Sequence, residues 1–269
     1  TMRDGIAGLM KKYKVEVVEG DAQLLPGLKI SVNGETHEAD NVLLCTGSSP
    51  AKPPIPGIDS EHVVDSTGIL NREILPERLI IVGGGVIGCE FACMYASVGV
   101  PVTVLEAMSE ICPNLDKDIS AVLREGLSKK GVQFKLETKV ESIGPRSVSF
   151  ADSEGSGSIE GDLVLVATGR KPNVSDLGLE DLGLDFDARG VRVNDKGATN
   201  VPGLWAAGDV TGEAWLAHAA SRMAEVVVNN LNGRPDHMRF DKMPAVVYTS
   251  PEVAVVGLTK EEAEAKGLK

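Results

Sequence analysis

Short apolar runs recur along the chain, and several end at a glycine or an acidic residue. Leu79–Val82 is wholly apolar and lacks the polar alternation of a half-buried strand. Such a run is typical of a parallel strand that is covered on both faces. Further strands of this kind are expected at Val42–Cys45, Val102–Leu105, Leu163–Ala167 and Leu204–Ala207. The pattern therefore predicts an α/β fold.

Amphipathic segments that end near glycines predict the helices. We expect helices at residues 4–14, 90–98, 118–130 and 216–231. Weaker patterns predict strands at 15–18, 28–32 and 35–39, a strand from Val132, a hairpin region at 139–159 and a strand-rich tail after Met243. Pro50–Pro56 holds four prolines in seven residues, so we expect an extended connection there.

The net charge of the chain argues against two classes of binding partner. The 269 residues carry a formal net charge of −12, whereas phosphate and anionic lipid surfaces are bound by clustered Lys and Arg. We therefore expect neither a nucleic-acid nor a membrane partner. No apolar run approaches the length that spans a bilayer.

The cysteines indicate a reducing compartment, and hence a cytoplasmic protein. The chain has four cysteines, too few for a disulfide scaffold at this length. Cys89 and Cys93 share one helix face, and we interpret them as small packing residues. None of the cysteines has the C-x-x-x-x-C spacing of a redox dithiol. We identify no catalytic residue and no metal ligand in this chain.

The strongest chemical signal is the glycine pattern G-x-G-x-x-G, which lies between a predicted strand and a predicted helix. Gly83 allows a tight turn, Gly85 allows backbone to approach a pyrophosphate, and Gly88 allows close packing of helix on strand. The N–H groups at the helix start, including those of Val86 and Ile87, favour phosphate. This pattern predicts a dinucleotide-binding site.

An acidic residue follows the second strand of the same unit. Glu106 lies 18 residues after Gly88, where a carboxylate can accept both ribose hydroxyls of an adenosine. It would repel a 2′-phosphate, so NAD is favoured over NADP.

The chain resembles the flavoprotein disulfide reductases that have two dinucleotide-binding domains. Seven collinear segments carry the resemblance: LLCTGSSP (43–50), IIVGGGVIGCEFA (80–92), VTVLEA (102–107), VLVATGRKPN (164–173), LWAAGDV (204–210), LAHAAS (216–221) and YTSPEVAVVG (248–257). Within this family, NLDKDIS (114–120), LAHAAS and YTSPEVA are most similar to the dihydrolipoamide dehydrogenase branch.

The resemblance implies a domain order and two cofactors. Residues 1–75 would be the later part of an FAD-binding domain, 76–198 an inserted Rossmann-like NAD-binding domain with three layers, 199–242 the return segment of the FAD-binding domain, and 243–269 the start of a dimerisation domain. The family's glycine motif for FAD and its redox cysteines would precede residue 1. Its His–Glu base would follow Lys269. We therefore expect this stretch alone to be inactive.

The resemblance also assigns cofactor contacts. Those implied for FAD are Thr46, Gly47, Asp209, Leu216, Ala217 and His218, with Gly208 permitting the close approach. Asp209 could alternatively cap a turn. Gly169 would contact NAD. Glu90 would lie near the nicotinamide or would be an ordinary acid that stabilises the helix dipole. Arg170 is interpreted as a solvated or structural arginine.

The implied activity is oxidation of protein-bound dihydrolipoamide through a redox disulfide and FAD to NAD. The implied partners are a lipoyl-bearing acyltransferase or carrier protein and a second copy of the enzyme. Two alternatives stay open. One is another NAD(P)H-dependent flavoprotein disulfide reductase or NADH oxidase, and the other is a stand-alone NAD-binding or redox-sensing module.

Overall fold

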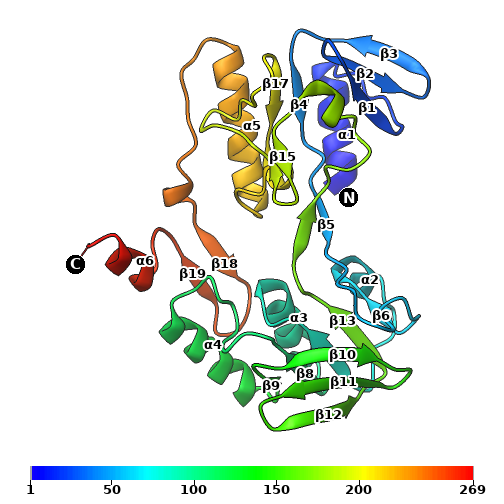
Figure 1. The fold of residues 1–269 in the computed structure, drawn as a ribbon, viewed down its shortest axis with the longest axis vertical. Coiled ribbons are helices and arrows are strands. Elements are labelled where there is room, and N and C mark those ends of the chain that lie inside the picture. Colours follow the sequence, from blue (N-terminus) through cyan, green and yellow to red (C-terminus); the bar gives the residue numbers. More distant parts are fainter. Residues whose placement is uncertain (1, 269) are drawn as a thin grey trace. The chain divides into compact units, whose positions relative to one another are not determined.

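The computed structural model describes residues 2–268, and these residues form two compact units (Figure 1). The first unit comprises the residues up to Gly47 together with Pro172–Met238. The second unit comprises Ser48–Lys171 and the residues from Arg239 onward. The chain therefore passes between the units at three junctions.

A five-stranded parallel sheet is the centre of the second unit. Its order is β6-β13-β7-β8-β9. The strands are β6 (Val63–Val64), β13 (Leu163–Val166), β7 (Leu79–Val82), β8 (Val102–Leu105) and β9 (Gln133–Lys135). Every residue of β7 and β13 is buried, as the unbroken apolar runs predicted.

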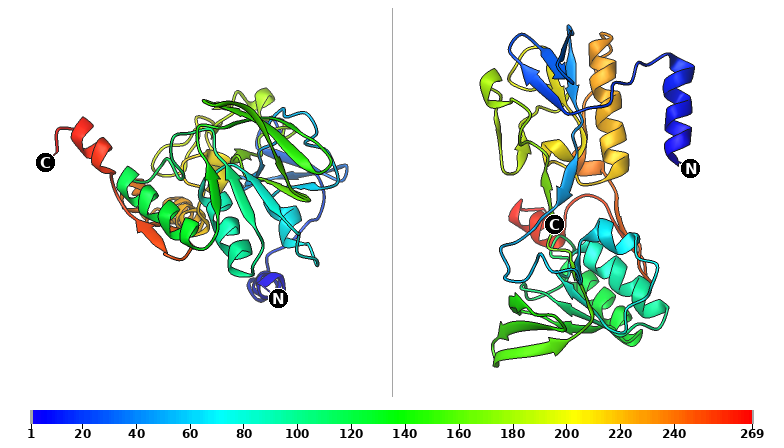
Figure 2. Two further views of the ribbon diagram at one scale, coloured as in Figure 1. Left: turned by 90° about the horizontal axis from the view of Figure 1, so that it is seen from below. Right: turned by 90° about the vertical axis from the view of Figure 1, so that its right-hand side faces the viewer.

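Alternate residues of β7 face two different layers. Leu79 and Ile81 belong to the core beneath α3 (Val86–Ser97) and α4 (Lys117–Lys129). Ile80 and Val82 belong to the core beneath a three-stranded antiparallel sheet. That sheet contains β10 (Lys139–Ile143), β11 (Ser147–Asp152) and β12 (Gly155–Glu160). The predicted three-layer α/β arrangement is confirmed, and Figure 2 shows the antiparallel sheet on the face away from the helices.

Shorter elements complete the second unit. They are β5 (Ser48–Pro50), α2 (Ser66–Leu70), β14 (Arg170–Pro172, whose last residue begins the first unit), η3 (Phe240–Lys242), β18 (Ala245–Val247), β19 (Val253–Val255) and α6 (Lys260–Ala265). The side chain of Asp65 caps α2, and Thr259 forms a capping box at the start of α6. β18 and β19 pair antiparallel, so the tail after Met243 is strand-rich at first, as predicted.

The first unit contains a pair of parallel strands. β4 (Val42–Leu44) pairs in parallel with β17 (Leu204–Ala206), and both contribute to a core that includes Leu179 and Val191. The other elements are α1 (Met2–Tyr13), β1 (Ala22–Leu25), β2 (Lys29–Val32), β3 (Glu35–Glu38), η1 (Glu180–Leu182), β15 (Phe186–Asp187), β16 (Gly190–Val191), η2 (Gly208–Thr211) and α5 (Ala217–Leu231).

Three elements differ from the prediction. Residues 15–18 form no strand, and the side chains of Val15, Val17 and Val18 are exposed because no neighbouring strand pairs with them. The helix predicted from Glu90 begins at Val86, immediately after Gly85, so Gly88 lies in its first turn. β1 was not predicted; it is held by antiparallel pairing with β2 rather than by an apolar run.

The contacts group the residues differently from the domain order that the resemblance implies. Residues 48–75 lie in the second unit, because β6 pairs with β13. Residues 172–198 lie in the first unit, whose core includes Val191. The boundaries at 75, 198 and 242 stay predictions.

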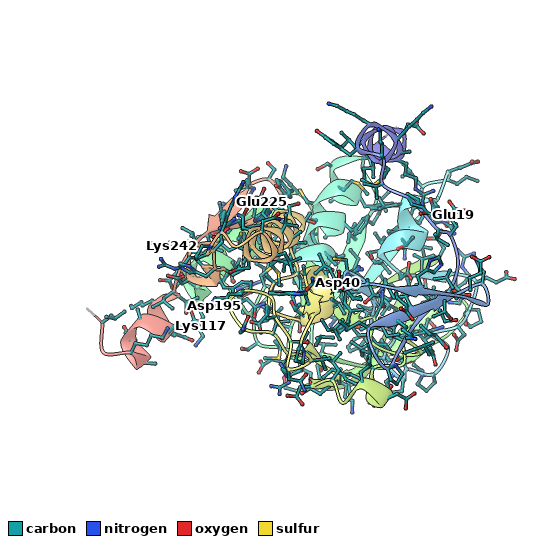
Figure 3. All side chains as sticks on the ribbon, turned by 90° about the horizontal axis from the view of Figure 1, so that it is seen from above. Glu19, Asp40, Lys117, Asp195, Glu225 and Lys242 are labelled. Carbon is teal, nitrogen blue, oxygen red and sulfur yellow. The ribbon has the colours of Figure 1, made fainter. Side chains whose placement is uncertain are left out.

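The negative charge is carried at the surface. The acidic residues Glu19, Asp40, Asp195 and Glu225 are all exposed (Figure 3). Within residues 2–268, no helix has the length and apolar character needed to cross a bilayer.

Candidate functional site

Three predicted nucleotide contacts meet at one edge of the parallel sheet. β13, β7 and β8 are neighbours and run in the same direction. Their carboxyl ends lead into Gly169, Gly83 and Glu106 respectively. Ligands of open α/β sheets bind outside this edge, so the structure brings these residues together where the glycine pattern required it.

Two glycines of the pattern are needed for packing. Gly83 has φ +107°, and a Cβ there would lie 2.5 Å from the carbonyl oxygen of Ala167. A Cβ at Gly88 would lie 2.0 Å from the carbonyl oxygen of Gly83. Neither position can accept a side chain unless the backbone moves, so Gly88 lets α3 approach the end of β7 and Gly83 lets the turn approach the end of β13.

Gly85 is different, because the space beside it is open. Among residues 2–268, no atom lies within 4 Å of a Cβ built at Gly85. Gly85 is the N-cap of α3 and has no side chain that could accept from the N–H groups of Val86, Ile87 and Gly88. These N–H groups have no partner inside the helix, and the helix dipole favours an anion beside them. The structure thus fits a pyrophosphate at this point.

Glu106 connects the end of β8 to the glycine turn. One carboxylate oxygen accepts a hydrogen bond from the N–H of Gly84 at 2.5 Å, and the other accepts one from the N–H of Met108 at 2.7 Å. The residue is 8% exposed. A carboxylate has about four lone-pair directions, so each oxygen can accept one more hydrogen bond. Glu106 can therefore support the turn and still bind ribose hydroxyls.

Glu90 lies one turn beyond the start of α3 and has a partner that the sequence did not indicate. Its carboxylate accepts a hydrogen bond from the backbone N–H of Tyr248 at 2.9 Å. It therefore ties α3 to the segment that follows β18. Its position near the nicotinamide and its role in stabilising the helix dipole both stay predictions.

The segment after β13 is held by the connection that precedes β6. Gly169 has φ +120°, and its carbonyl oxygen accepts from the N–H of Ala51. Arg170 donates from Nε to the Ser48 hydroxyl at 2.7 Å and from a terminal nitrogen to the Ser48 carbonyl at 2.8 Å. The structural interpretation of Arg170 agrees with these bonds.

A second edge of the same kind lies in the first unit. The parallel strands β4 and β17 lead at their carboxyl ends into Thr46-Gly47 and Gly208-Asp209. Gly47 has φ +69° and Gly208 has φ +80°. The structure thus brings Thr46, Gly47 and Asp209 together at one edge. Asp209 is half-buried in η2.

Two further contacts define this second edge. The Thr46 hydroxyl donates to the carbonyl of Asn173, and the Asn173 amide donates to the carbonyl of Thr46, both at 2.8 Å. A Cβ at Gly208 would lie 3.2 Å from the Cβ of Ala220, so η2 packs closely on α5. Leu216 is the N-cap of α5 and is half-buried, whereas Ala217 and His218 in the first turn are exposed.

The sequence analysis missed a sulfur contact beneath the glycine turn. The Sγ atoms of Cys89 and Cys112 lie 3.8 Å apart, and both residues are buried. Cys93 is also buried in this core, in agreement with the packing interpretation of Cys89 and Cys93. Hydrogen bonding to Cys112, followed by burial, raises the pKa of the Cys89 thiol. The sequence signal that could have indicated this contact was the apolar Ile111-Cys112 pair within an otherwise polar loop.

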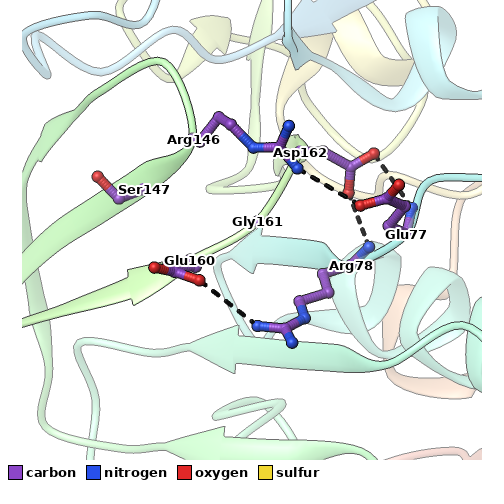
Figure 4. A pocket seen from close by; sticks show the side chains of 7 residues that line it. All are labelled: Glu77, Arg78, Arg146, Ser147, Glu160, Gly161 and Asp162. Carbon is purple, nitrogen blue, oxygen red and sulfur yellow. Dashed lines mark hydrogen bonds and ion pairs between the residues drawn. The ribbon is translucent and has the colours of Figure 1, made fainter.

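A hollow of about 380 Å³ lies at the opposite edge of the sheet, where β7 and β13 begin (Figure 4). Arg146 pairs with Glu77 at 3.4 Å and Arg78 pairs with Glu160 at 3.7 Å. Both guanidinium groups thus have a carboxylate partner. Asp162 accepts from the backbone N–H groups of Glu77 and Arg78. Asp162 therefore holds the backbone just before β7.

The sequence matches one protein family over most of its length. Residues 1–224 match the pyridine nucleotide-disulphide oxidoreductase family, and residues 243–269 match the dimerisation domain of the same family. Members of this family use FAD and a pyridine nucleotide.

Individual relatives agree with this match. Dihydrolipoyl dehydrogenase of Chlamydia pneumoniae is 36% identical over 272 residues, which are 99% of this chain and 59% of that protein. Leghemoglobin reductase of Glycine max is 38% identical and is covered to 53%. The chain therefore spans between half and three-fifths of the length of these two relatives.

Solved structures show the same fold. LpdA of Mycobacterium tuberculosis has a TM-score of 0.88 at 32% identity, over 98% of this chain and 60% of that one. The HOCl-induced flavoprotein disulfide reductase of Escherichia coli has a TM-score of 0.84 at 32% identity, over 94% and 59%.

Proposed function

The chain belongs to the pyridine nucleotide-disulphide oxidoreductase family, and we propose that it is the NAD-binding portion of a dihydrolipoyl dehydrogenase. The complete enzyme would oxidise protein-bound dihydrolipoamide through a redox disulfide and FAD, with NAD as the final acceptor. The observation that carries the proposal is the joint position of Gly85 and Glu106 beside an uncapped helix start.

The residues of the second unit would hold the nucleotide as follows. The N–H groups of Val86, Ile87 and Gly88 would donate to the pyrophosphate, which the open space at Gly85 admits. The two oxygens of Glu106 would accept from the ribose hydroxyls, and their charge would repel a 2′-phosphate. Bound NAD supplies a hydride acceptor. Gly169, after the end of β13, would contact the NAD, and Glu90 would lie near its nicotinamide ring.

The first unit would contribute to a flavin site. Thr46 and Gly47 after β4 and Asp209 after β17 would contact FAD, with the first turn of α5 (Leu216, Ala217 and His218) beside them. The parallel pairing of β4 with β17 supports this, because it brings both segments to one edge. The positive φ of Gly208 lets the backbone approach a ligand there.

The domain order and the partners follow from the same proposal. Residues 1–75 and 199–242 would belong to the FAD-binding domain, 76–198 to the NAD-binding domain and 243–269 to the dimerisation domain. The match of residues 243–269 to the family's dimerisation domain supports a homodimer. The electron donor would be a lipoyl-bearing acyltransferase or carrier protein, and four free cysteines favour the cytoplasm.

Two experiments test this proposal: sequencing of the coding DNA and an activity assay with lipoamide. Sequencing the coding DNA on both sides should find G-x-G-x-x-G and C-x-x-x-x-C upstream, and a His and a Glu a few residues apart downstream. The product of that frame should reduce lipoamide with NADH. A frame without these motifs would contradict the proposal.

A second candidate is a reductase of the same family with another disulfide or protein substrate. The similarity to leghemoglobin reductase and to the HOCl-induced reductase, at identities like those of the dihydrolipoyl dehydrogenases, favours it. The same product assayed with glutathione disulfide, coenzyme A disulfide and lipoamide would separate the two candidates.

A further inference from the structure

Two buried thiols support the glycine turn from below. Cys89 lies in α3, and Cys112 lies in the loop between β8 and α4. The residues are 0% and 2% exposed, and their Sγ atoms lie 3.8 Å apart. Both sulfurs also approach the carbonyl oxygen of Gly84, at 3.3 and 3.8 Å. The nucleotide site described above uses neither thiol.

The same Gly84 carbonyl accepts the backbone N–H of Cys112 at 2.9 Å, while the N–H of Gly84 donates to Glu106. The peptide groups of Gly84 are therefore held from two sides, by the thiol pair and by the acid at the end of β8. Any movement of Cys112 is transmitted to the turn that approaches the pyrophosphate.

We propose that Cys89 and Cys112 are a dithiol that a small hydroperoxide converts to a disulfide, and that this disulfide weakens NAD binding. The second half rests on the proposed binding of NAD at the glycine turn. The first half stands on the sulfur contact alone.

Cys112 is the thiol that reacts first. It is followed by the exposed residues Pro113 and Asn114, whereas Cys89 lies within a helix against the core. Its φ of +45° is in the left-handed region that L residues seldom adopt. The hydrogen bond between the two thiols lowers the pKa of Cys112, which favours the nucleophilic thiolate there.

The chemistry balances with the peroxide as oxidant. The Cys112 thiolate attacks one peroxide oxygen, the O–O bond breaks, and the departing hydroxide takes up the thiol proton to form water. Cys112 is then a sulfenic acid. The Cys89 sulfur attacks the Cys112 sulfur, the S–O bond breaks, and the hydroxide leaves with the Cys89 proton as a second water. The two thiols together lose two electrons, and hydrogen peroxide is reduced to two waters, whereas an organic hydroperoxide would give one alcohol and one water.

The disulfide changes the support of the turn. Its sulfurs approach from 3.8 Å to about 2.05 Å, and neither sulfur can then donate a hydrogen bond to the Gly84 carbonyl. A Cβ at Gly84 would lie only 3.0 Å from Ile111 and 3.1 Å from Glu106. With so little room around Gly84, a shift of Cys112 displaces both the turn and the acid that hold NAD.

The test treats the reduced chain with hydrogen peroxide and maps its cysteines by mass spectrometry. Hydrogen exchange of the Gly84 to Gly88 amides and the Kd of NAD are measured before and after oxidation. We expect a Cys89–Cys112 link, faster exchange in the turn, and a Kd about fivefold higher or more, the lower end of typical coupling between sites. Dithiothreitol should reverse all three changes.

Three variants serve as controls. C89S and C112S should form no such link, and peroxide should leave their Kd for NAD unchanged. C93S, a buried cysteine one turn further along α3, should behave as the unaltered chain does.

Each contrary result has a separate meaning. If peroxide leaves Cys89 and Cys112 unlinked, the proposal is overturned. If the link forms while exchange in the turn and the Kd stay the same, the regulatory half is overturned. If the reduced chain binds no NAD, the proposed function fails and the regulatory half fails with it, whereas the mapped link still decides the dithiol assignment.

Discussion

At the scale of single residues, the glycines of one pattern have different physical roles. A side chain at Gly88 would collide with the backbone of Gly83, whereas a side chain at Gly85 would enter open space. The structure thus separates Gly88, which close packing requires, from Gly85, which packing does not require and which we propose admits a ligand. The spacing alone assigns both to one motif.

Alanine substitutions test this difference. Gly85→Ala should leave the free energy of unfolding within about 0.5 kcal/mol of the original and raise the Kd of NAD about tenfold, because its methyl group occupies the space for the pyrophosphate. Gly88→Ala should lower the free energy of unfolding by about 1–3 kcal/mol, the usual cost of overpacking. Urea unfolding and calorimetry measure the two effects. Equal loss of stability in both variants would contradict the assignment.

Site residues that recur at a fixed spacing along the chain could be predicted from the sequence. Contacts between residues that the fold brings together could not. Gly83, Gly85, Gly88 and Glu106 follow from the strand–turn–helix–strand order. The hydrogen bond from Gly84 to Glu106 and the Cys89–Cys112 contact depend on how the loop after β8 folds back. No local pattern encodes that path.

At the scale of elements, Asp236 fixes the segment that follows α5. Its carboxylate accepts from Arg222 at 2.6 Å, from Asn229 at 2.8 Å and from the N–H of His237 at 2.9 Å. The hydrogen bond from Arg222, followed by the one from Asn229, lowers the pKa of Asp236 to about 2. The carboxylate is therefore more stable in the folded chain than in the unfolded one.

This shift predicts a pH dependence. The folded pKa of about 2 is below the ordinary value of 3.8, so the stabilisation is fully present above pH 3.8 and is lost as the pH falls towards 2. Asp236→Asn should lower the urea midpoint at pH 6, and the difference should narrow at pH 3. Urea titrations of both proteins at these pH values measure it. A difference that does not change with pH would show that the charge is not responsible.

Elements with an unbroken apolar run were predicted closely, because burial on both faces leaves a clear signal. β7 has the predicted bounds, and so does β8, in which Thr103 is the one polar residue. Residues 15–18 have the composition of a strand, but a strand forms only where a neighbour accepts its hydrogen bonds. The two-residue strands β15 and β16 depend on each other in the same way and have no local pattern.

At the scale of the whole molecule, the chain contains the proposed nucleotide-binding residues but no pair of cysteines with the spacing of the family's redox dithiol. None of its four cysteines is part of a C-x-x-x-x-C pattern. We expect the 269 residues to show no lipoamide-dependent oxidation of NADH above the rate without protein. An assay that follows the absorbance of NADH in the presence of lipoamide measures it. Clear turnover would mean that another pair of cysteines is redox-active.

The most direct test of the central claim is calorimetric titration of the chain with NAD and with NADP. The account predicts that NAD binds about 100-fold more tightly, because the Glu106 carboxylate repels a 2′-phosphate. Glu106→Gln should reduce this preference, whereas Glu110→Gln, a nearby acid paired with Arg124, should leave it intact. Equal affinity for NAD and NADP, or no binding of NAD, would contradict the account.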